Sequence, residues 1–266
     1  MPRHADPNAK EALVAAARGE FARRGLRGAR VEDITAACGL SKGAFYLHYD
    51  SKESLFAELV QGFFAPLSQK GEDRRCRMTE FLRKNGAITR RDVQLRTPRY
   101  RELIALETAG DLELLRHMWA YRDVVGVLIR GCQGTKFEGA IWELTDREVS
   151  RIKESFTHFQ DLHVCRRDVP GEVFGSLIVG TFVLLGVRMS GLTEQPDLEE
   201  WARSLHTLIR EGSAPPGHEH AHAPAPRQKA ASAVRSKEVP PPAAKHAPSP
   251  RSPKTKSTTR RIRSAS

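Results

Sequence analysis

Cysteine is scarce in this sequence, and its four copies are not arranged in pairs. Cys38, Cys76, Cys132 and Cys165 lie far apart, and no two of them have Cys-x-x-Cys spacing. A disulfide-dense small domain is therefore excluded, and a reducing compartment fits best. The first ten residues contain no apolar stretch, so we do not expect a secretory signal there. These features predict a cytoplasmic location.

Long hydrophobic runs are also missing. The longest, VFGSLIVGTFVLLGV at residues 173–187, has 15 residues, fewer than the roughly 20 that are needed to cross a bilayer. We therefore expect a buried helix in a soluble protein, with no membrane partner. Strand-like alternation is scarce, whereas apolar residues recur at helical spacing over residues 1–212. The expected fold class is all-α.

Excess positive charge is absent from most of the chain. The net charge is +11, of which residues 213–266 contribute +9 and residues 1–212 only +2. The segment 213–266 has ten prolines, eleven alanines and no Phe, Tyr or Trp. Such a composition cannot bury enough apolar surface to offset the lost chain entropy, so we expect a disordered basic tail.

Helix boundaries follow from caps and glycines. Asp6 and Ser41 are expected N-caps, Asp50 and Glu53 have capping-box spacing, and Gly25 is expected to end the first helix in a left-handed conformation. The longest apolar run carries Ser176 and Gly180, small residues that allow a close helix partner. The expected helices cover residues 7–24, 31–38, 42–49, 51–68, 72–85, 98–109, 111–132, 145–166, 169–190 and 197–211.

Residues 31–49 have the spacing of a helix-turn-helix unit, with Gly39 at the turn. Leu40, Phe45 and Tyr49 are expected to pack inward. The outward side chains are small, basic or aromatic, which suits contact with bases and phosphates. A three-helix cluster that does not bind DNA has the same spacing. The candidate DNA-binding residues are Arg30, Ser41, Lys42, Gly43, Ala44, Tyr46, His48 and Lys52.

Residues 10–60 resemble the N-terminal domain of the TetR family of bacterial transcriptional regulators. The matching positions are Phe21 and Gly25, the segments Val31–Ile34, Gly39–Gly43 and Asp50–Leu55, and Tyr46 and His48. The resemblance implies that Tyr46 and Lys52 grip phosphates and that the N-terminal half of the second helix of the unit reads bases. Ala29, Thr35 and Tyr49 depart from the usual Thr, Ala and Phe. Ala29 puts one hydroxyl–phosphate contact in doubt.

The resemblance also implies a helical ligand-sensing and dimerisation domain after the DNA-binding domain. We expect the domains to be residues 1–60 and 61–212, with the tail at 213–266. The homodimer is expected to form through about 145–190. An apolar or aromatic effector is expected among aromatic side chains and two polar ones, although aromatic residues at helical spacing are more often plain core. The candidate pocket residues are His117, Met118, Trp119, Tyr121, Arg122, Phe137 and Trp142.

The expected function is that of a TetR-like homodimeric repressor that binds a near-palindromic double-stranded DNA operator and is released by a small-molecule ligand. It would be nucleoid-associated. Residues 131–136, GCQGTK, lack phosphate-loop spacing. No catalytic set stands out, so we expect no enzyme, cofactor or metal; the histidines of residues 218–222 are read as polar composition. The alternatives are an architectural DNA-binding protein driven by the basic tail, and an enzyme or ligand carrier.

Overall fold

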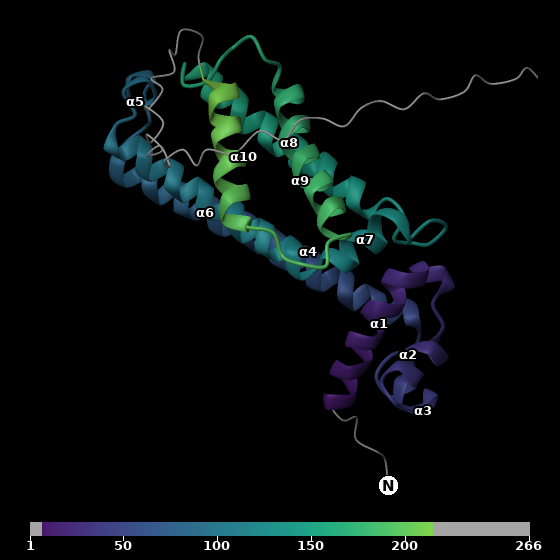
Figure 1. Ribbon diagram of the computed structural model, residues 1–266. Helices are drawn as coiled ribbons and strands as arrows, with labels where there is room; N and C mark the ends of the chain where they lie inside the picture. The colour runs from purple at the N-terminus through teal and green to yellow at the C-terminus, as the bar shows by residue number, and fades with distance from the viewer. Residues whose placement is uncertain (1–6, 215–266) are drawn as a thin grey trace, which may run out of the picture. The chain divides into compact units, whose positions relative to one another are not determined.

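The computed structural model describes residues 7–214, and these are folded into helices and connecting turns without a strand (Figure 1). The predicted all-α class is confirmed. The expected cap at Asp6, the histidines of 218–222 and almost all of the tail lie outside the described residues. The helices in the described part are α1 (Pro7–Gly28), α2 (Val31–Ala37), α3 (Lys42–Tyr46), α4 (Lys52–Asn85), α5 (Arg90–Leu95), α6 (Pro98–Ala120), α7 (Arg122–Arg130), α8 (Ala140–Asp161), α9 (Gly171–Met189) and α10 (Leu198–Ser213).

Helix α1 buries the face that its sequence predicts. Leu13, Ala17 and Phe21, at successive four-residue steps, are each at most 1% exposed. The regular helix ends at Gly25, whose φ of 68° is positive as predicted. Its ψ of 172° is extended rather than left-handed helical, a combination that is essentially restricted to glycine. One further turn then completes α1.

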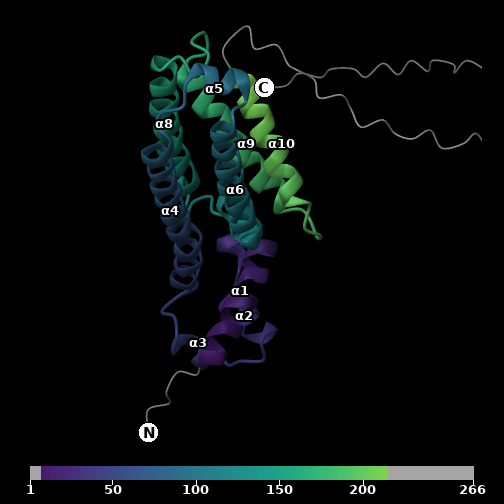
Figure 2. The same cartoon turned by 90° about the vertical axis from the view of Figure 1, so that its left-hand side faces the viewer.

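Helix α4 is one continuous helix of 34 residues, although a break was expected at Gly71, between helices at 51–68 and 72–85 (Figure 2). An interior glycine costs only about 1 kcal/mol relative to alanine, so tertiary packing overrides it. The N-cap is Ser51, which forms a reciprocal capping box with Ser54. The expected box of Asp50 and Glu53 is therefore wrong by one residue.

Helix α6 also continues through an expected break, at Gly110. This glycine is buried beneath Arg74 of α4, and a Cβ here would lie 3.4 Å from the Arg74 side chain. The Arg74 guanidinium bonds Glu107 and Asp111 on either side of the glycine. The glycine thus makes room for an inter-helix ion pair. The chain turns at Tyr121 instead, where α6 gives way to α7.

Helices α8 and α9, which are consecutive in the sequence, pack against each other. Gly175 permits this approach, because a Cβ there would lie 2.7 Å from the carbonyl oxygen of Val149. The rings of Phe156 and Phe174 stack 3.9 Å apart. Within the described part, α9 is also the one helix that length and composition alone would allow to cross a membrane.

The outer face of α9 is not buried, contrary to the prediction. Val173, Leu177 and Leu184 are 57%, 62% and 69% exposed, and a Cβ at Gly180 would meet nothing within 4 Å. These four positions follow the i, i+4, i+7, i+11 spacing of one helical stripe. The helix therefore has an apolar side that the described residues leave uncovered.

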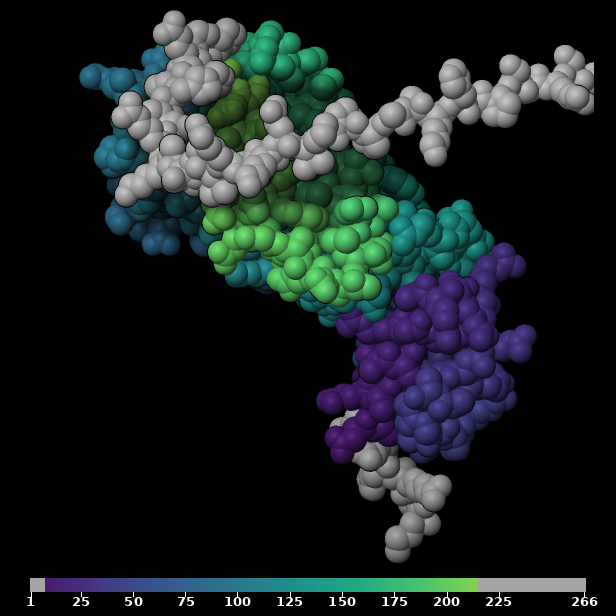
Figure 3. All heavy atoms as spheres, in the orientation of Figure 1, coloured from purple at the N-terminus to yellow at the C-terminus, as the bar shows by residue number. Residues whose placement is uncertain are grey.

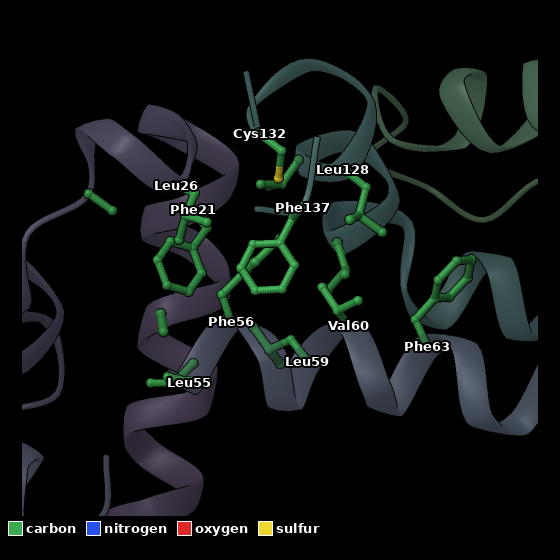
Figure 4. Close-up of a cluster of buried hydrophobic side chains, with 14 of the residues drawn as sticks. Phe21, Leu26, Leu55, Phe56, Leu59, Val60, Phe63, Leu128, Cys132 and Phe137 are labelled. Carbon is green, nitrogen blue, oxygen red and sulfur yellow. The ribbon is translucent and has the colours of Figure 1, made fainter. Parts of the chain in front are cut away.

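A single hydrophobic core joins α1–α3 to the following helices (Figure 4). The ring of Phe56, on α4, makes edge-to-face contacts with Phe21 of α1 and with Phe137, at centroid distances of 5.2 Å and 5.0 Å. In the space-filling view the purple atoms of the N-terminal part lie directly against teal and green atoms of later parts of the chain (Figure 3). The division at residues 60 and 61 stays a prediction.

Candidate nucleic-acid interface

Buried side chains fix the orientation of α3 relative to α1 and α2. Ile34 and Phe45 are fully buried and Tyr49 is 6% exposed, as the sequence predicts. Gly39 takes a φ of 68° at the turn, a value that glycine adopts without strain. The hydroxyl of Ser41 accepts a hydrogen bond from the backbone N–H of Ala44 at 3.2 Å, which confirms Ser41 as the N-cap.

The side of α3 that faces solvent is made of small, basic and aromatic residues. Ser41, Lys42 and Gly43 are exposed, and Tyr46 and Leu47 are 57% and 52% exposed. Among residues 7–214 nothing covers Gly43, whose added Cβ would touch only the Ser41 hydroxyl, at 3.7 Å. The helix ends at Tyr46, earlier than the predicted Tyr49. An exposed apolar and basic surface on a rigid core is suited to docking against a large ligand.

Lys42 is held by a carboxylate of the preceding helix. Its ammonium group forms an ion pair with Glu32, the second residue of α2. The hydrogen bond raises the pKa of Lys42 and lowers that of Glu32. Both side chains are 54% exposed, so solvent screens the pair and Lys42 can exchange Glu32 for another anion.

Lys52 has a different environment from the one the sequence suggests. Its ammonium group donates to the carbonyl oxygens of Arg27, at 3.0 Å, and Ala29, at 2.8 Å. It thereby fastens the start of α4 to the chain that joins α1 and α2. The Glu53 carboxylate also lies 4.0 Å from this ammonium group. The observed role of Lys52 is internal bracing, and its phosphate contact stays a prediction.

The other candidates lie around the same surface. Arg30 is exposed and occupies the N-cap position of α2 without a side-chain cap bond. Ala44 and His48 are half-buried, and the imidazole of His48 lies beside the ring of Tyr49. Ala29 is 1% exposed, which explains how a residue without a hydroxyl fits at this position. The structure thus gathers the eight candidates at α2, α3 and the start of α4.

The candidate pocket residues are more dispersed. His117 bonds the carbonyl oxygen of Phe63 at 2.8 Å and stacks on its ring, and Tyr121 lies against both. Met118 fills the space above Gly186. These contacts are those of packed core. Trp119 lies beneath the Arg122 guanidinium, and Phe137 belongs to the core shown in Figure 4. Trp142 lies on the surface and is 57% exposed.

An ion pair that the sequence does not reveal ties α1 to α7. Arg18 donates to both carboxylate oxygens of Asp123, at 2.6 Å and 2.7 Å, and to the carbonyl oxygen of Ala120. Burial opposes ionisation of Asp123, but the hydrogen bonds and charge of Arg18 still lower its pKa. The backbone N–H of Leu26 also donates to the Gly131 carbonyl oxygen at 3.0 Å. These two residue pairs are each about a hundred positions apart, and no local pattern links them.

Known proteins match the chain chiefly in this N-terminal part. Residues 13–59 match the family described as bacterial regulatory proteins, tetR family. The HTH-type transcriptional repressor KstR2 of Rhodococcus jostii is 48% identical over 50 residues, which are 19% of this chain and 24% of that protein. The uncharacterised regulator YdgC of Bacillus subtilis is 33% identical over 99 residues, 37% of this chain and 44% of YdgC. The chain thus matches less than half the length of either relative.

A solved structure extends the similarity in fold. The ketosteroid transcriptional regulator KstR2 of Mycobacterium tuberculosis superposes with a TM-score of 0.56 over 79% of this chain and 96% of that one, at 18% sequence identity. At this identity the likeness concerns the fold. The helix-turn-helix geometry and the family match agree on the N-terminal part: residues 13–59 resemble the tetR family of bacterial regulatory proteins, and the described helices as a whole share the fold of KstR2.

Proposed function

We propose that this protein is a sequence-specific DNA-binding transcriptional regulator that acts as a homodimeric repressor and responds to a small-molecule effector. The observation that carries the proposal is the exposed surface of α3. Ser41, Lys42, Gly43 and Tyr46 face solvent while Phe45 and Tyr49 hold the helix on its core. KstR2 of Rhodococcus jostii, a relative that is named as a repressor, supports repression rather than activation.

In this proposal α3 enters the major groove, and its side chains make different kinds of contact with the DNA. Lys42 exchanges Glu32 for a guanine edge or a phosphate, and the small residues Gly43 and Ala44 allow close approach to the bases. Tyr46 and Arg30 contact phosphates, which position the helix without reading sequence. Lys52 keeps the two helices in place through its bonds to Arg27 and Ala29.

A homodimer supplies the second reading head. A helix as short as α3 contacts only a few base pairs, and two copies about one helical turn apart, ~34–36 Å, read a near-palindrome. The uncovered apolar stripe of α9 is the surface that we assign to the partner subunit, with α8 beside it. Ser176 is exposed and Gly180 is open to solvent, so a second helix can approach closely on this side.

An effector would act through the junction between α1 and the larger helical part. An effector changes DNA affinity only when it binds more tightly to one arrangement of the two α3 helices of the dimer than to the other. The Arg18–Asp123 pair and the Leu26–Gly131 hydrogen bond are the contacts through which such a preference would reach α1. The effector's chemical class remains the apolar or aromatic one predicted from the residues of α6.

Selection of binding sites from random duplexes by the full-length protein tests the proposal. We expect enrichment of a near-palindrome, and loss of enrichment in the Lys42→Ala, Tyr46→Ala double variant. Leu208→Ala, which removes another exposed side chain, 69% exposed on α10, is the control and should select the same sequence. Binding without any enriched sequence would support an architectural protein driven by the basic tail instead.

A further inference from the structure

A wide groove lies between α1, α7 and residues 190–193, at the junction held by the Arg18–Asp123 pair. It has a volume of about 1100 Å³ and is open to solvent. The residues that line it carry six guanidinium groups and a single carboxylate, that of Asp123. The six arginines are Arg18, Arg23, Arg24, Arg27, Arg122 and Arg130.

Half of these arginines already have carboxylate partners. Arg18 pairs with Asp123. Arg23 and Arg24 share the buried carboxylate of Glu20, which is also on α1. Arg24 also binds Asp33 at 2.8 Å. These pairs fix the position of their guanidinium groups and neutralise part of their charge.

The other three arginines form no ion pair within the described residues. Arg122 donates to the Trp119 carbonyl oxygen at 3.1 Å and covers the indole ring, 4.0 Å from its centroid. Arg130 donates to the Ser190 hydroxyl at 2.8 Å. Arg27 is exposed at the end of α1. Neutral partners thus orient two of these guanidinium groups while leaving their charge uncompensated.

We infer that this groove binds a small polyphosphate anion. Guanidinium groups bind phosphate oxygens through two parallel hydrogen bonds, and a concave surface lined by one sign of charge concentrates counter-ions of the other. The volume exceeds that of one phosphate and admits a chain of several, alone or attached to a nucleoside.

The groove is unsuited to the DNA that α3 would bind. Helix α7 packs at one end of the α1–α3 unit, and α3 lies at the other end (Figure 1). The arginines of the groove come from α1 on one side and from α7 on the other, so a bound anion bridges the two. If α3 reads DNA as proposed above, the bridge changes operator affinity; the binding itself does not depend on that proposal.

Calorimetric titration of the full-length protein with inorganic tripolyphosphate, without DNA, tests the inference. The Arg122→Gln, Arg130→Gln variant should bind at least tenfold more weakly. Arg101→Gln, Arg203→Gln removes the same charge from exposed arginines of α6 and α10 and should bind as the wild type does. The Arg122→Lys, Arg130→Lys variant retains the charge. Its affinity for tripolyphosphate should fall several-fold, because the paired guanidinium hydrogen bonds are gone.

Further titrations distinguish a nucleotide from an inorganic polyphosphate as the bound anion. Tighter binding of ATP than of tripolyphosphate identifies a nucleotide site, and equal binding identifies an inorganic polyphosphate site. Equal weakening by the two glutamine double variants would overturn the inference, because attraction would then depend on net charge alone. Loss of duplex affinity in Arg122→Gln, Arg130→Gln with unchanged tripolyphosphate binding would also overturn it, and would assign the groove to DNA.

Discussion

At the scale of single residues, Gly25 occupies the most restrictive position at the junction. Its φ of 68° and ψ of 172° strain any other residue, and a Cβ would lie 3.1 Å from the Gly131 carbonyl oxygen. Gly25→Ala should therefore lower the free energy of unfolding by about 1–3 kcal/mol. Urea unfolding followed by circular dichroism measures this change.

The matched control for that variant is Gly19→Ala on the same helix. A Cβ at Gly19 meets nothing within 4 Å, and its φ is not positive. Alanine should stabilise α1 there by about 0.5–1 kcal/mol. If Gly25→Ala were as stable as the wild type, the junction would not depend on this backbone conformation.

Glu32 restrains Lys42 in the absence of DNA, and this too is a single-residue effect. Removing the charge by Glu32→Gln frees the ammonium group for a phosphate. Because solvent screens an exposed pair, its release should raise duplex affinity only modestly. Fluorescence anisotropy with a labelled duplex measures it.

The control for this variant is Asp33→Asn, which removes one negative charge from the same turn of α2 but leaves Lys42 paired. It breaks only the pair with Arg24. Its duplex affinity should rise less than that of Glu32→Gln. Equal gains for the two variants would show that general charge, and not the release of Lys42, controls affinity.

At the scale of helices, local signals in the sequence identify some boundaries and miss others. Gly39, Ser41 and the apolar spacing of α1 predict the helix-turn-helix unit because each acts within one or two turns of chain. Gly71 and Gly110 mislead, since a glycine in a helix costs little once a neighbouring helix packs on it. Helix α5 was missed because its six residues are fixed by contacts of Asp92.

Asp92 holds α5 and the start of α6 together. It is 5% exposed and accepts bonds from Arg99, Thr97 and the Thr89 cap. The Arg99 bond above all holds the pKa of Asp92 well below its usual range. A lowered pKa in the folded state stabilises the protein above about pH 4, and that stabilisation is lost as the pH falls.

Asp92→Asn should therefore cost about 1–3 kcal/mol at pH 7, and the difference from the wild type should shrink between pH 4 and pH 2. Urea midpoints across this range measure it. Asp168→Asn is the control: Arg166 lowers the pKa of Asp168 to about 2, but its side chain is 57% exposed. A difference for Asp92→Asn that did not change with pH would contradict the ionic account.

At the scale of the whole molecule, the uncovered side of α9 predicts how subunits pair. A charge placed in a buried interface is strongly unfavourable, so Leu184→Glu should weaken self-association more than about tenfold. Leu208→Glu on α10 is the control, because Leu184 and Leu208 are both 69% exposed in the single chain. Sedimentation velocity measures the association. Equal behaviour of the two variants would place the interface elsewhere.

Contacts between distant segments are what the sequence could not predict. The candidate DNA-binding residues lie within about twenty positions of one another, so spacing and resemblance were enough to gather them. The Arg18–Asp123 pair joins residues 105 positions apart, and the arginine groove exists only because α7 packs on α1. Phe137, expected in a pocket, instead joins Phe56 in the shared core.

The most direct test of the central claim is the specificity ratio of the full-length protein. Its affinity for the selected duplex should be compared with its affinity for a scrambled duplex of equal composition, at physiological salt. Specific regulators bind their sites at least about a thousandfold more tightly than other DNA, and we expect a ratio of that size. Equal affinities that both fall steeply with salt would contradict the account, since charge alone would then explain all binding.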